Sequence, residues 1–183
     1  MLTLPVAEFA DFKKLLGKEP LEIGEEEFCQ DIGSRRTRLK ALLLDQTVLC
    51  GVGNIYADES LFRARLHPAR TAEKLKKEQL LALRSAVREV LEEAIEFRGS
   101  SISDYRDSNG KKGTFQQQHR VYQRDGEPCV RCKSIIRRII VAGRSTHFCP
   151  SCQPAGRTRK ASKKKSRLRV KPLVRKSKKK KSK

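Results

Sequence analysis

Residues Leu42–Pro68 read LLLDQTVLCGVGNIYADESLFRARLHP, and this stretch decides the fold. Apolar side chains recur at helical spacing on both sides of Gly51-Val52-Gly53-Asn54, whereas glycines inside a single helix are unfavourable. We therefore predict a helix from about Arg35 to Val48, a tight turn, and a second helix from Asn54 to about Leu66. Asn54 is also a residue type that caps helix N-termini well.

A turn of this kind can either bind an anion or serve only to connect two helices. Glycines let another backbone or a phosphate approach closely, and the positive end of the helix that begins near Asn54 attracts an anion. The side chain of Asn54 can donate its amide to the same oxygen. Alternatively, the turn is an ordinary tight corner between two helices with an Asn cap. A lone glycine-rich turn is a weak motif, so spacing alone leaves both interpretations open.

The rest of the chain predicts a mainly α fold. Helical periodicity covers three further segments: residues 5–16, 25–32 and 77–97. Gly99 is the expected stop of the last one. Residues 100–118 are rich in Ser, Gly, Asp and Asn and are expected to form a loop. The β structure is confined to a small module after this loop, which begins with the strand-like sequence HRVYQR.

Four of the six cysteines form two tight pairs separated by sixteen residues: Cys129/Cys132 and Cys149/Cys152. Two such pairs on tight turns can present four thiolates tetrahedrally to one Zn²⁺ ion, and four thiolates leave no open position for catalysis. We therefore expect one structural zinc. Two disulfides, a redox pair and an iron site are the alternatives, and a reducing compartment disfavours the disulfides. Cys29 and Cys50 are expected to be buried small apolar residues.

The residues between the cysteine pairs fit a β-hairpin. We expect Ile135–Val141 as the outgoing strand, Gly143-Arg144 as the turn and Ser145–Phe148 as the returning strand. A hairpin of this size has too small an apolar core to fold stably alone. Metal binding would therefore supply much of its folding free energy. At the tip, Arg144 can reach a phosphate or a base edge with its fork of donors. The alternative is a solvated surface arginine.

The positive charge is concentrated at the end of the chain. The formal net charge is +21, and Pro154–Lys183 holds 16 Lys and Arg residues and no acid, which leaves +5 for residues 1–153. We expect this tail to be disordered and to attract a polyanion, most simply nucleic acid; the alternative is a solubilising extension. The sequence contains no run of about 18 apolar residues and no secretory signal, so we expect neither a transmembrane helix nor export.

The Leu42–Pro68 sequence closely resembles the helix–two-turn–helix element of the bacterial formamidopyrimidine-DNA glycosylase family, which includes the endonuclease VIII branch. Residues 121–153, VYQRDGEPCVRCKSIIRRIIVAGRSTHFCPSCQ, resemble the C-terminal zinc finger of that family. The closing Cys-Gln and the loop before the finger favour the formamidopyrimidine branch. The resemblance implies four parts: an N-terminal remnant or linker with the first helices (1–32), a helix–two-turn–helix DNA-binding domain with a lesion-loop-like segment (33–118), a zinc finger (119–153) and a disordered basic tail (154–183).

The resemblance also implies a DNA interface. Asn54 matches the family's asparagine that holds a phosphate beside the lesion, and Gly51 and Gly53 flank the same turn. Arg144 matches the arginine at the hairpin tip that grips the same stretch of backbone. Lys40 lies where family members often carry a phosphate-contacting lysine, and the four paired cysteines match the zinc ligands. The implied partner is double-stranded DNA with oxidised bases or abasic sites, bound by a monomer.

No catalytic residue is expected in this chain. The family's nucleophile is a proline left at the N-terminus after Met removal and followed by a glutamate, and it forms a Schiff base with the sugar before β,δ-elimination. Residue 2 here is Leu, and Pro5 is internal and followed by Val6. The resemblance therefore implies the DNA-binding C-terminal half of an 8-oxoguanine glycosylase and abasic-site lyase. Its catalysis would require the missing N-terminal domain, either fused or supplied as a separate chain.

Two other functions remain open. A non-catalytic DNA-binding module could use the same turn, finger and tail to hold bent or damaged duplex. An RNA- or ribosome-associated protein is the third hypothesis, because helix–two-turn–helix elements and zinc ribbons with basic tails also occur there. All three place the protein in the bacterial cytoplasm, and the DNA-binding versions place it at the nucleoid.

Overall fold

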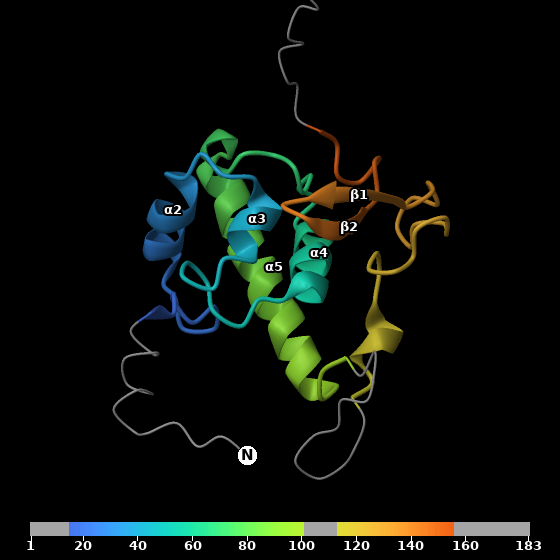
Figure 1. The fold of residues 1–183 in the computed structure, drawn as a ribbon, viewed down its shortest axis with the longest axis horizontal. Helices are drawn as coiled ribbons and strands as arrows, with labels where there is room; N and C mark the ends of the chain where they lie inside the picture. The colour runs from blue at the N-terminus through green and yellow to red at the C-terminus, as the bar shows by residue number, and fades with distance from the viewer. Residues whose placement is uncertain (1–14, 101–112, 156–183) are drawn as a thin grey trace, which may run out of the picture.

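A computed structural model describes residues 15–100 and 113–155 (Figure 1). Its regular elements are α2 (Glu25–Gly33), α3 (Leu39–Leu43), α4 (Asn54–Arg63), α5 (Lys77–Glu96), the strands β1 (Arg137–Val141) and β2 (Arg144–Phe148), and two short 3₁₀ helices (Ala72–Lys74 and Phe115–Gln118). The mainly α fold with one small hairpin is confirmed. Most of the helix expected at residues 5–16, most of the loop expected at 100–118 and nearly all of the basic tail lie outside the described residues.

The helical part is built around α5, which packs against both α4 and α2. In Figure 1 this long helix runs diagonally behind α3, with α2 on one side and α4 on the other. The helical periodicity predicted for residues 77–97 is confirmed, because the buried residues of α5 recur at three- and four-residue intervals: Leu80, Leu83, Ala86, Val87, Val90 and Ala94. No helix of the described part of the chain is long and apolar enough to cross a membrane.

Helix α3 is much shorter than the predicted helix over residues 35–48, for reasons at both ends. Before it, the chain is extended, because Arg38 bridges to Thr71 and the Thr37 carbonyl accepts the Ala72 N–H at 3.0 Å. After it, Asp45 Oδ1 accepts both the N–H and the hydroxyl of Thr47, which replaces the next helical turn by an Asx turn. The three leucines of this short helix, Leu39, Leu42 and Leu43, are nevertheless all buried.

Helix α4 begins at the predicted place but is capped differently. The capping position is Gly53 rather than Asn54, and the cap makes no side-chain hydrogen bond. The helix ends at Arg63, earlier than predicted, because Arg65 takes a left-handed conformation (φ 57°). The Leu66 N–H then bonds the Leu61 carbonyl at 3.0 Å, which is the hydrogen bond that closes a Schellman motif.

The hairpin differs from its prediction in register. The two turn residues are Ala142 (φ 50°) and Gly143 (φ 73°), and this pair of positive φ angles is the mark of a type I′ turn. Arg144 is consequently the first residue of β2, paired with Val141, and not part of the turn. The strand predicted at HRVYQR is wrong, because in residues 119–124 the successive N–H groups of Arg120, Val121 and Tyr122 bond the Glu59 carboxylate instead of a neighbouring strand.

The finger is packed onto α4 and does not have a core of its own. Phe62 of α4 is fully buried in a cluster with four finger residues, two of them apolar and two cysteines: Val121, Ile136, Cys129 and Cys149. Figure 1 shows the hairpin lying above α4, in agreement with the contacts between α4 and β2. A single helix therefore carries the glycine turn at its beginning and the finger along its length.

Candidate nucleic-acid interface and metal centre

The turn before α4 is held by hydrogen bonds from the Gln46 side chain, while its glycine backbone is exposed to solvent. The Gln46 side chain accepts the Gly51 N–H at 2.9 Å and donates to the Val52 carbonyl at 3.1 Å, so it fixes the first two residues of the turn. Gly51 has a φ of +76°, which only glycine adopts without strain. A Cβ built on Gly51 or Gly53 would meet no atom within 4 Å among the described residues. The backbone of this turn is thus accessible to another molecule.

Asn54 begins α4 with an unsatisfied side chain. Its Oδ1 is buried and has no hydrogen-bond partner among the described residues. Helix geometry also directs the first N–H groups of α4 out of its N-terminal end, and the partial positive charge of the helix dipole lies at the same point. The unpaired oxygen is an acceptor and cannot itself bind an anion. The donors next to the accessible turn are the side-chain amide N–H groups of Asn54 and the first backbone N–H groups of α4.

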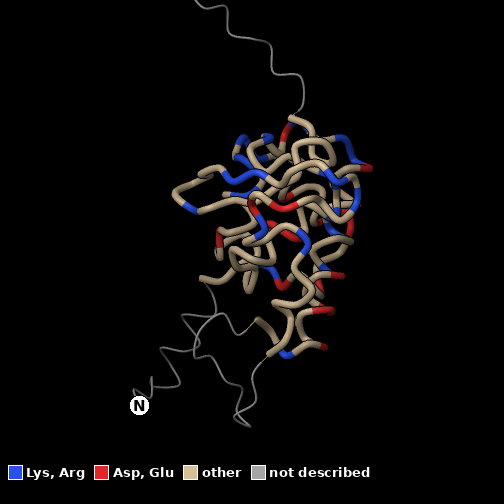
Figure 2. Tube along the Cα trace, turned by 90° about the vertical axis from the view of Figure 1, so that its right-hand side faces the viewer, with Lys and Arg blue, Asp and Glu red and all other residues tan. Residues whose placement is uncertain are grey.

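Arg144 stands at the tip of the hairpin with an exposed side chain. Its backbone is fixed, since the hydroxyl of buried Thr146 donates to the Arg144 carbonyl at 3.1 Å. Its guanidinium has no hydrogen-bond or ion-pair partner within residues 15–100 and 113–155. Figure 2 shows that Lys and Arg positions gather at the end of the molecule that carries the hairpin. Arg137 and Arg138 are also exposed there, so the hairpin presents a basic surface.

Lys40 does not belong to this surface, which corrects the expectation of a phosphate contact. The side chain is fully buried, and its Nζ donates to Asp58 Oδ1 at 2.6 Å and to the Ser145 carbonyl at 2.8 Å. Burial lowers the pKa of Lys40 below its ordinary value, and the negative charge of Asp58 partly opposes this shift. An ammonium enclosed in this way cannot reach a phosphate without opening the core.

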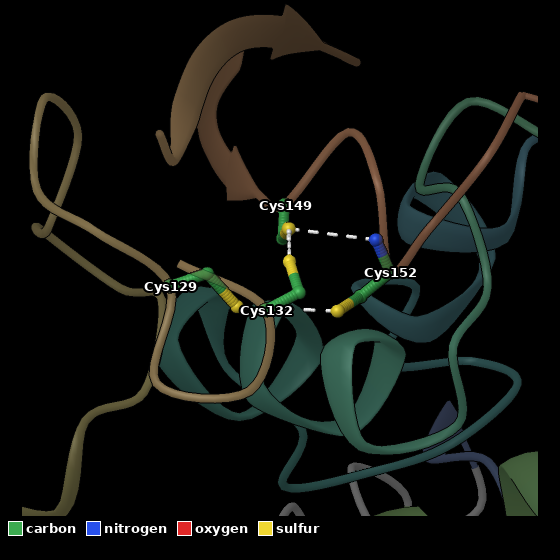
Figure 3. Close-up of side chains that lie close together, drawn as sticks. All are labelled: Cys129, Cys132, Cys149 and Cys152. Atoms are coloured by element: carbon green, nitrogen blue, oxygen red, sulfur yellow. Dashed lines mark hydrogen bonds between the residues drawn. The ribbon is translucent and has the colours of Figure 1, made fainter. Parts of the chain in front are cut away.

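The four paired cysteines converge in space (Figure 3). Their Sγ atoms all lie within 4.8 Å of one another, with Cys132 and Cys149 separated by 3.4 Å and Cys129 and Cys152 by 3.9 Å. A tetrahedral zinc ion with Zn–S bonds of about 2.3 Å places its sulfurs about 3.8 Å apart, whereas a disulfide requires about 2.05 Å. The donor set and its spacing fit zinc and exclude the alternative of two disulfides in this arrangement.

The thiols have unequal environments. Hydrogen bonding to Ser134 lowers the pKa of Cys132 to about 6, whereas burial raises the pKa of Cys152 to about 12. Four thiolates this close repel one another, so all four are ionised together only around a cation. The backbone supports the cluster, because the Cys129 N–H donates to the Ser134 carbonyl at 2.9 Å and forms one of the two metal-binding turns.

Three buried polar side chains of the described residues join the helical part to the finger, and the sequence interpretation did not identify these contacts. Asp58 and Glu59 are acidic residues of α4, yet both are buried and hold finger backbone: Asp58 bonds the His147 N–H, and Glu59 bonds three N–H groups of residues 120–122. Gln153 is also buried, and joins the Cys149 N–H to the Leu66 carbonyl. One signal was available, since Asp58 lies three and four residues before the core residues Leu61 and Phe62 and therefore shares their face.

Comparison with protein families gives two matches in the order observed along the chain. The model of the formamidopyrimidine-DNA glycosylase H2TH domain matches residues 16–106, and the model of the zinc finger found in FPG and IleRS matches residues 126–155. The first covers the helix–two-turn–helix element with α5, and the second covers all four cysteines.

Named relatives and solved structures agree with these matches. The formamidopyrimidine-DNA glycosylase of Solibacter usitatus is 56% identical over 146 residues, which cover 80% of this chain and 55% of that protein. The crystal structure of MutM (Fpg) from Thermus thermophilus superposes with a TM-score of 0.73 at 50% identity, covering 78% of this chain and 55% of that one. Lactococcus lactis Fpg in complex with DNA containing an abasic site gives a TM-score of 0.74 at 38% identity, covering 81% and 55%.

The chain thus spans about half the length of the curated relatives that it matches. Within that span, both family domains, the four zinc ligands and the hairpin coincide in one molecule. The chain therefore belongs to the formamidopyrimidine-DNA glycosylase family, in its formamidopyrimidine branch, and carries that family's H2TH domain and zinc finger with one structural zinc ion.

Proposed function

We propose that this chain binds double-stranded DNA at abasic sites or oxidised bases, through two phosphate contacts. The first contact is made by Asn54, the N–H groups at the start of α4 and the backbone of Gly51 and Gly53. The second is made by Arg144. The observation that carries the proposal is the accessible glycine turn in front of the helix N-terminus at Asn54, where the side-chain amide N–H groups of Asn54 can donate to a phosphate.

The rigid packing of the finger on α4 supports two contacts that act together. The turn and the hairpin are both fixed to the same helix, so their spacing is set before DNA arrives. Phosphate contacts position a duplex without reading its sequence, so the lesion would have to be recognised by other means. The abasic-site DNA bound by Lactococcus lactis Fpg is the partner chemistry that we extend to this chain.

We also propose that base removal and strand cleavage need residues outside these 183. The family's chemistry requires an unprotonated amine that can reach the sugar carbon. Among the lysines that the structure describes, Lys40 is the one whose pKa burial lowers, and it is enclosed and paired with Asp58. On this proposal the chain binds the DNA on behalf of a catalytic domain, which is either fused to it or a separate chain. It acts in the bacterial cytoplasm, at the nucleoid.

The test is binding of the purified, zinc-loaded chain to a duplex with one abasic-site analogue, compared with the intact duplex. Replacing Arg144 or Asn54 by Ala should weaken binding by about tenfold, as expected for loss of a charge-assisted hydrogen bond. Arg144→Ala should also reduce the salt dependence by about one phosphate contact. Arg88→Ala is the matched control, because it removes a positive charge from α5, where Arg88 pairs only with Glu92 among the described residues.

Two results would overturn the proposal. If Arg144→Ala and Arg88→Ala weakened binding equally, the hairpin would contribute only general charge. If structured RNA bound more tightly than the abasic duplex, the chain would belong to an RNA-associated function instead. Borohydride trapping on the same duplex tests the second proposal, because a zinc-dependent covalent adduct formed by this chain alone would place a reactive amine within it.

A further inference from the structure

A buried polar cluster joins the helical domain to the finger, and none of the proposed DNA contacts belongs to it. It consists of Lys40 of α3, Asp58 of α4 and His147 of β2, all buried. The Lys40 ammonium donates to Asp58 Oδ1 at 2.6 Å. The other oxygen of Asp58 accepts the His147 N–H at 2.8 Å and lies 3.2 Å from Nδ1 of the same residue. Three separate elements are tied together through one carboxylate.

The second acceptor of Lys40 lies beside the proposed phosphate contact. Its Nζ donates to the Ser145 carbonyl at 2.8 Å, across 105 positions of the chain. A buried ammonium is stable only while acceptors surround it, so both acceptors are held close to Nζ. Because Ser145 directly follows Arg144, the lysine fixes the Ser145–Thr146 peptide group, one residue after the residue whose side chain would reach the DNA.

Other contacts hold the same short segment from the protein side. The Thr146 hydroxyl binds the Arg144 carbonyl at 3.1 Å, and Arg138 donates to the Ser145 hydroxyl at 2.7 Å. The Asp58 contact with His147 fixes the strand two residues after Ser145. The backbone of β2 is therefore anchored around Arg144, while the Arg144 side chain itself is exposed.

We propose that Lys40 is a positioning residue for Arg144: through the Ser145 carbonyl and Asp58 it sets the direction in which the Arg144 side chain leaves the hairpin. The proposal rests on the proposed function, in which Arg144 contacts a DNA phosphate. It replaces the role of direct phosphate contact for Lys40, since that ammonium is enclosed and both of its acceptors belong to the protein.

The geometry separates this role from a purely structural one. The Asp58–His147 contact by itself attaches the hairpin to α4. The Lys40–Ser145 contact adds a restraint closer to Arg144 along the strand, and a small rotation of the backbone there would displace the end of this long side chain. Loss of Lys40 should therefore affect binding through Arg144 and leave binding through Asn54 unchanged.

The experiment uses Lys40→Met and the double variant Lys40→Met/Asp58→Asn. The double variant avoids a buried carboxylate without its cation. The amide oxygen that replaces the carboxylate can still accept the His147 N–H, so the double variant should fold if the single variant does not. Lys18→Met is the matched control, because it removes an exposed lysine whose partner, Glu27, is also exposed. Zinc content and helical circular dichroism confirm that each variant is folded.

The first readout is amide hydrogen exchange of the free, zinc-loaded protein, which does not depend on DNA binding. Amides of residues 144–148 should exchange at least about tenfold faster in the Lys40 variants, whereas those of α5 should not change. Unchanged exchange in the hairpin would overturn the positioning role, whatever the protein binds. This readout keeps the inference testable even if the wild-type chain fails to bind the abasic duplex, a result that would overturn the proposed function alone.

The second readout is a pair of double-mutant cycles on the abasic duplex. The Lys40 variants should weaken binding by about tenfold, and adding Arg144→Ala should cause no further loss, because both changes remove the same contact. Adding Asn54→Ala should multiply the losses, because that contact is independent. If Lys40 and Arg144 effects multiplied, Lys40 would make a separate contact with DNA. If the Lys40 and Asn54 effects failed to multiply, Lys40 would act on the whole fold.

Discussion

Glu59 of α4 holds the Val121 N–H at 2.9 Å, across 62 residues of sequence. The same carboxylate accepts the N–H groups of Arg120 and Tyr122, at 3.0 and 2.9 Å, so three successive amides depend on one side chain. This segment is the entry to the finger. The attachment between the two parts of the molecule is therefore made by buried hydrogen bonds as well as by the apolar cluster around Phe62.

We expect Glu59→Ala to destabilise the protein by about 3 kcal/mol or more, because it leaves several enclosed N–H groups without an acceptor. Urea denaturation of the zinc-loaded protein measures this loss. Glu127→Ala is the control, since it removes an exposed glutamate that bonds Arg124 in the same region, and surface pairs of this kind contribute about 1 kcal/mol or less. Similar losses for the two variants would show that residues 120–122 are not anchored by Glu59.

Removal of zinc should unfold the finger and also weaken the helical part. Phe62 is fully buried against finger residues, so loss of the finger exposes a side chain whose burial contributes about 2–3 kcal/mol. We expect a metal chelator, or Cys149→Ser, to lower the urea midpoint of the helical circular dichroism signal without abolishing the signal. Cys50→Ser should retain one zinc per chain. A helical midpoint that did not change on zinc removal would mean that the H2TH domain folds independently of the finger.

Local patterns predicted the elements that depend only on neighbours in sequence. The stripe from Leu80 to Ala94 specified α5, and the cysteine spacing specified the metal centre, because each signal lies within one segment. The strand predicted at residues 119–124 was wrong because its hydrogen-bond acceptor, Glu59, lies about sixty positions away. The same long-range contacts account for Lys40, whose burial depends on Asp58 and Ser145, and no periodicity within α3 encodes them.

His119 should make the stability of the fold sensitive to acid. Burial lowers its pKa from 6.5 to about 4, its Nε2 lies 3.1 Å from the Ser100 hydroxyl, and its ring packs edge-on against Phe115 and Tyr122. The folded state thus holds His119 neutral, while the unfolded chain takes up a proton near pH 6.5. The contribution of neutral His119 is therefore fully present above pH 6.5 and is lost as the pH falls towards 4.

The variant His119→Phe keeps a ring of similar shape and removes the titration. Between pH 7 and pH 5, the wild type should lose more stability than this variant does, measured by urea denaturation at both pH values. Zinc loss at low pH affects both proteins alike, so the difference between them isolates His119. An equal loss in the two proteins would show that His119 does not change its protonation on unfolding.

Effects on DNA binding can be distinguished from effects on folding at the glycine turn, because α4 and α2 both begin after a glycine with the same kind of backbone. Gly53 precedes α4 and Gly24 precedes α2, both capping positions have extended backbones, and a Cβ on either would meet no atom within 4 Å among the described residues. Gly53→Ala and Gly24→Ala should therefore cause similar, small losses of stability, about 1 kcal/mol or less, from the poorer helix cap. Only Gly53→Ala adds a methyl group to the backbone that would face a phosphate, so only this variant should bind the abasic duplex more weakly, by about tenfold. Equal affinities for the two variants, with equal stabilities, would mean that DNA does not approach this turn.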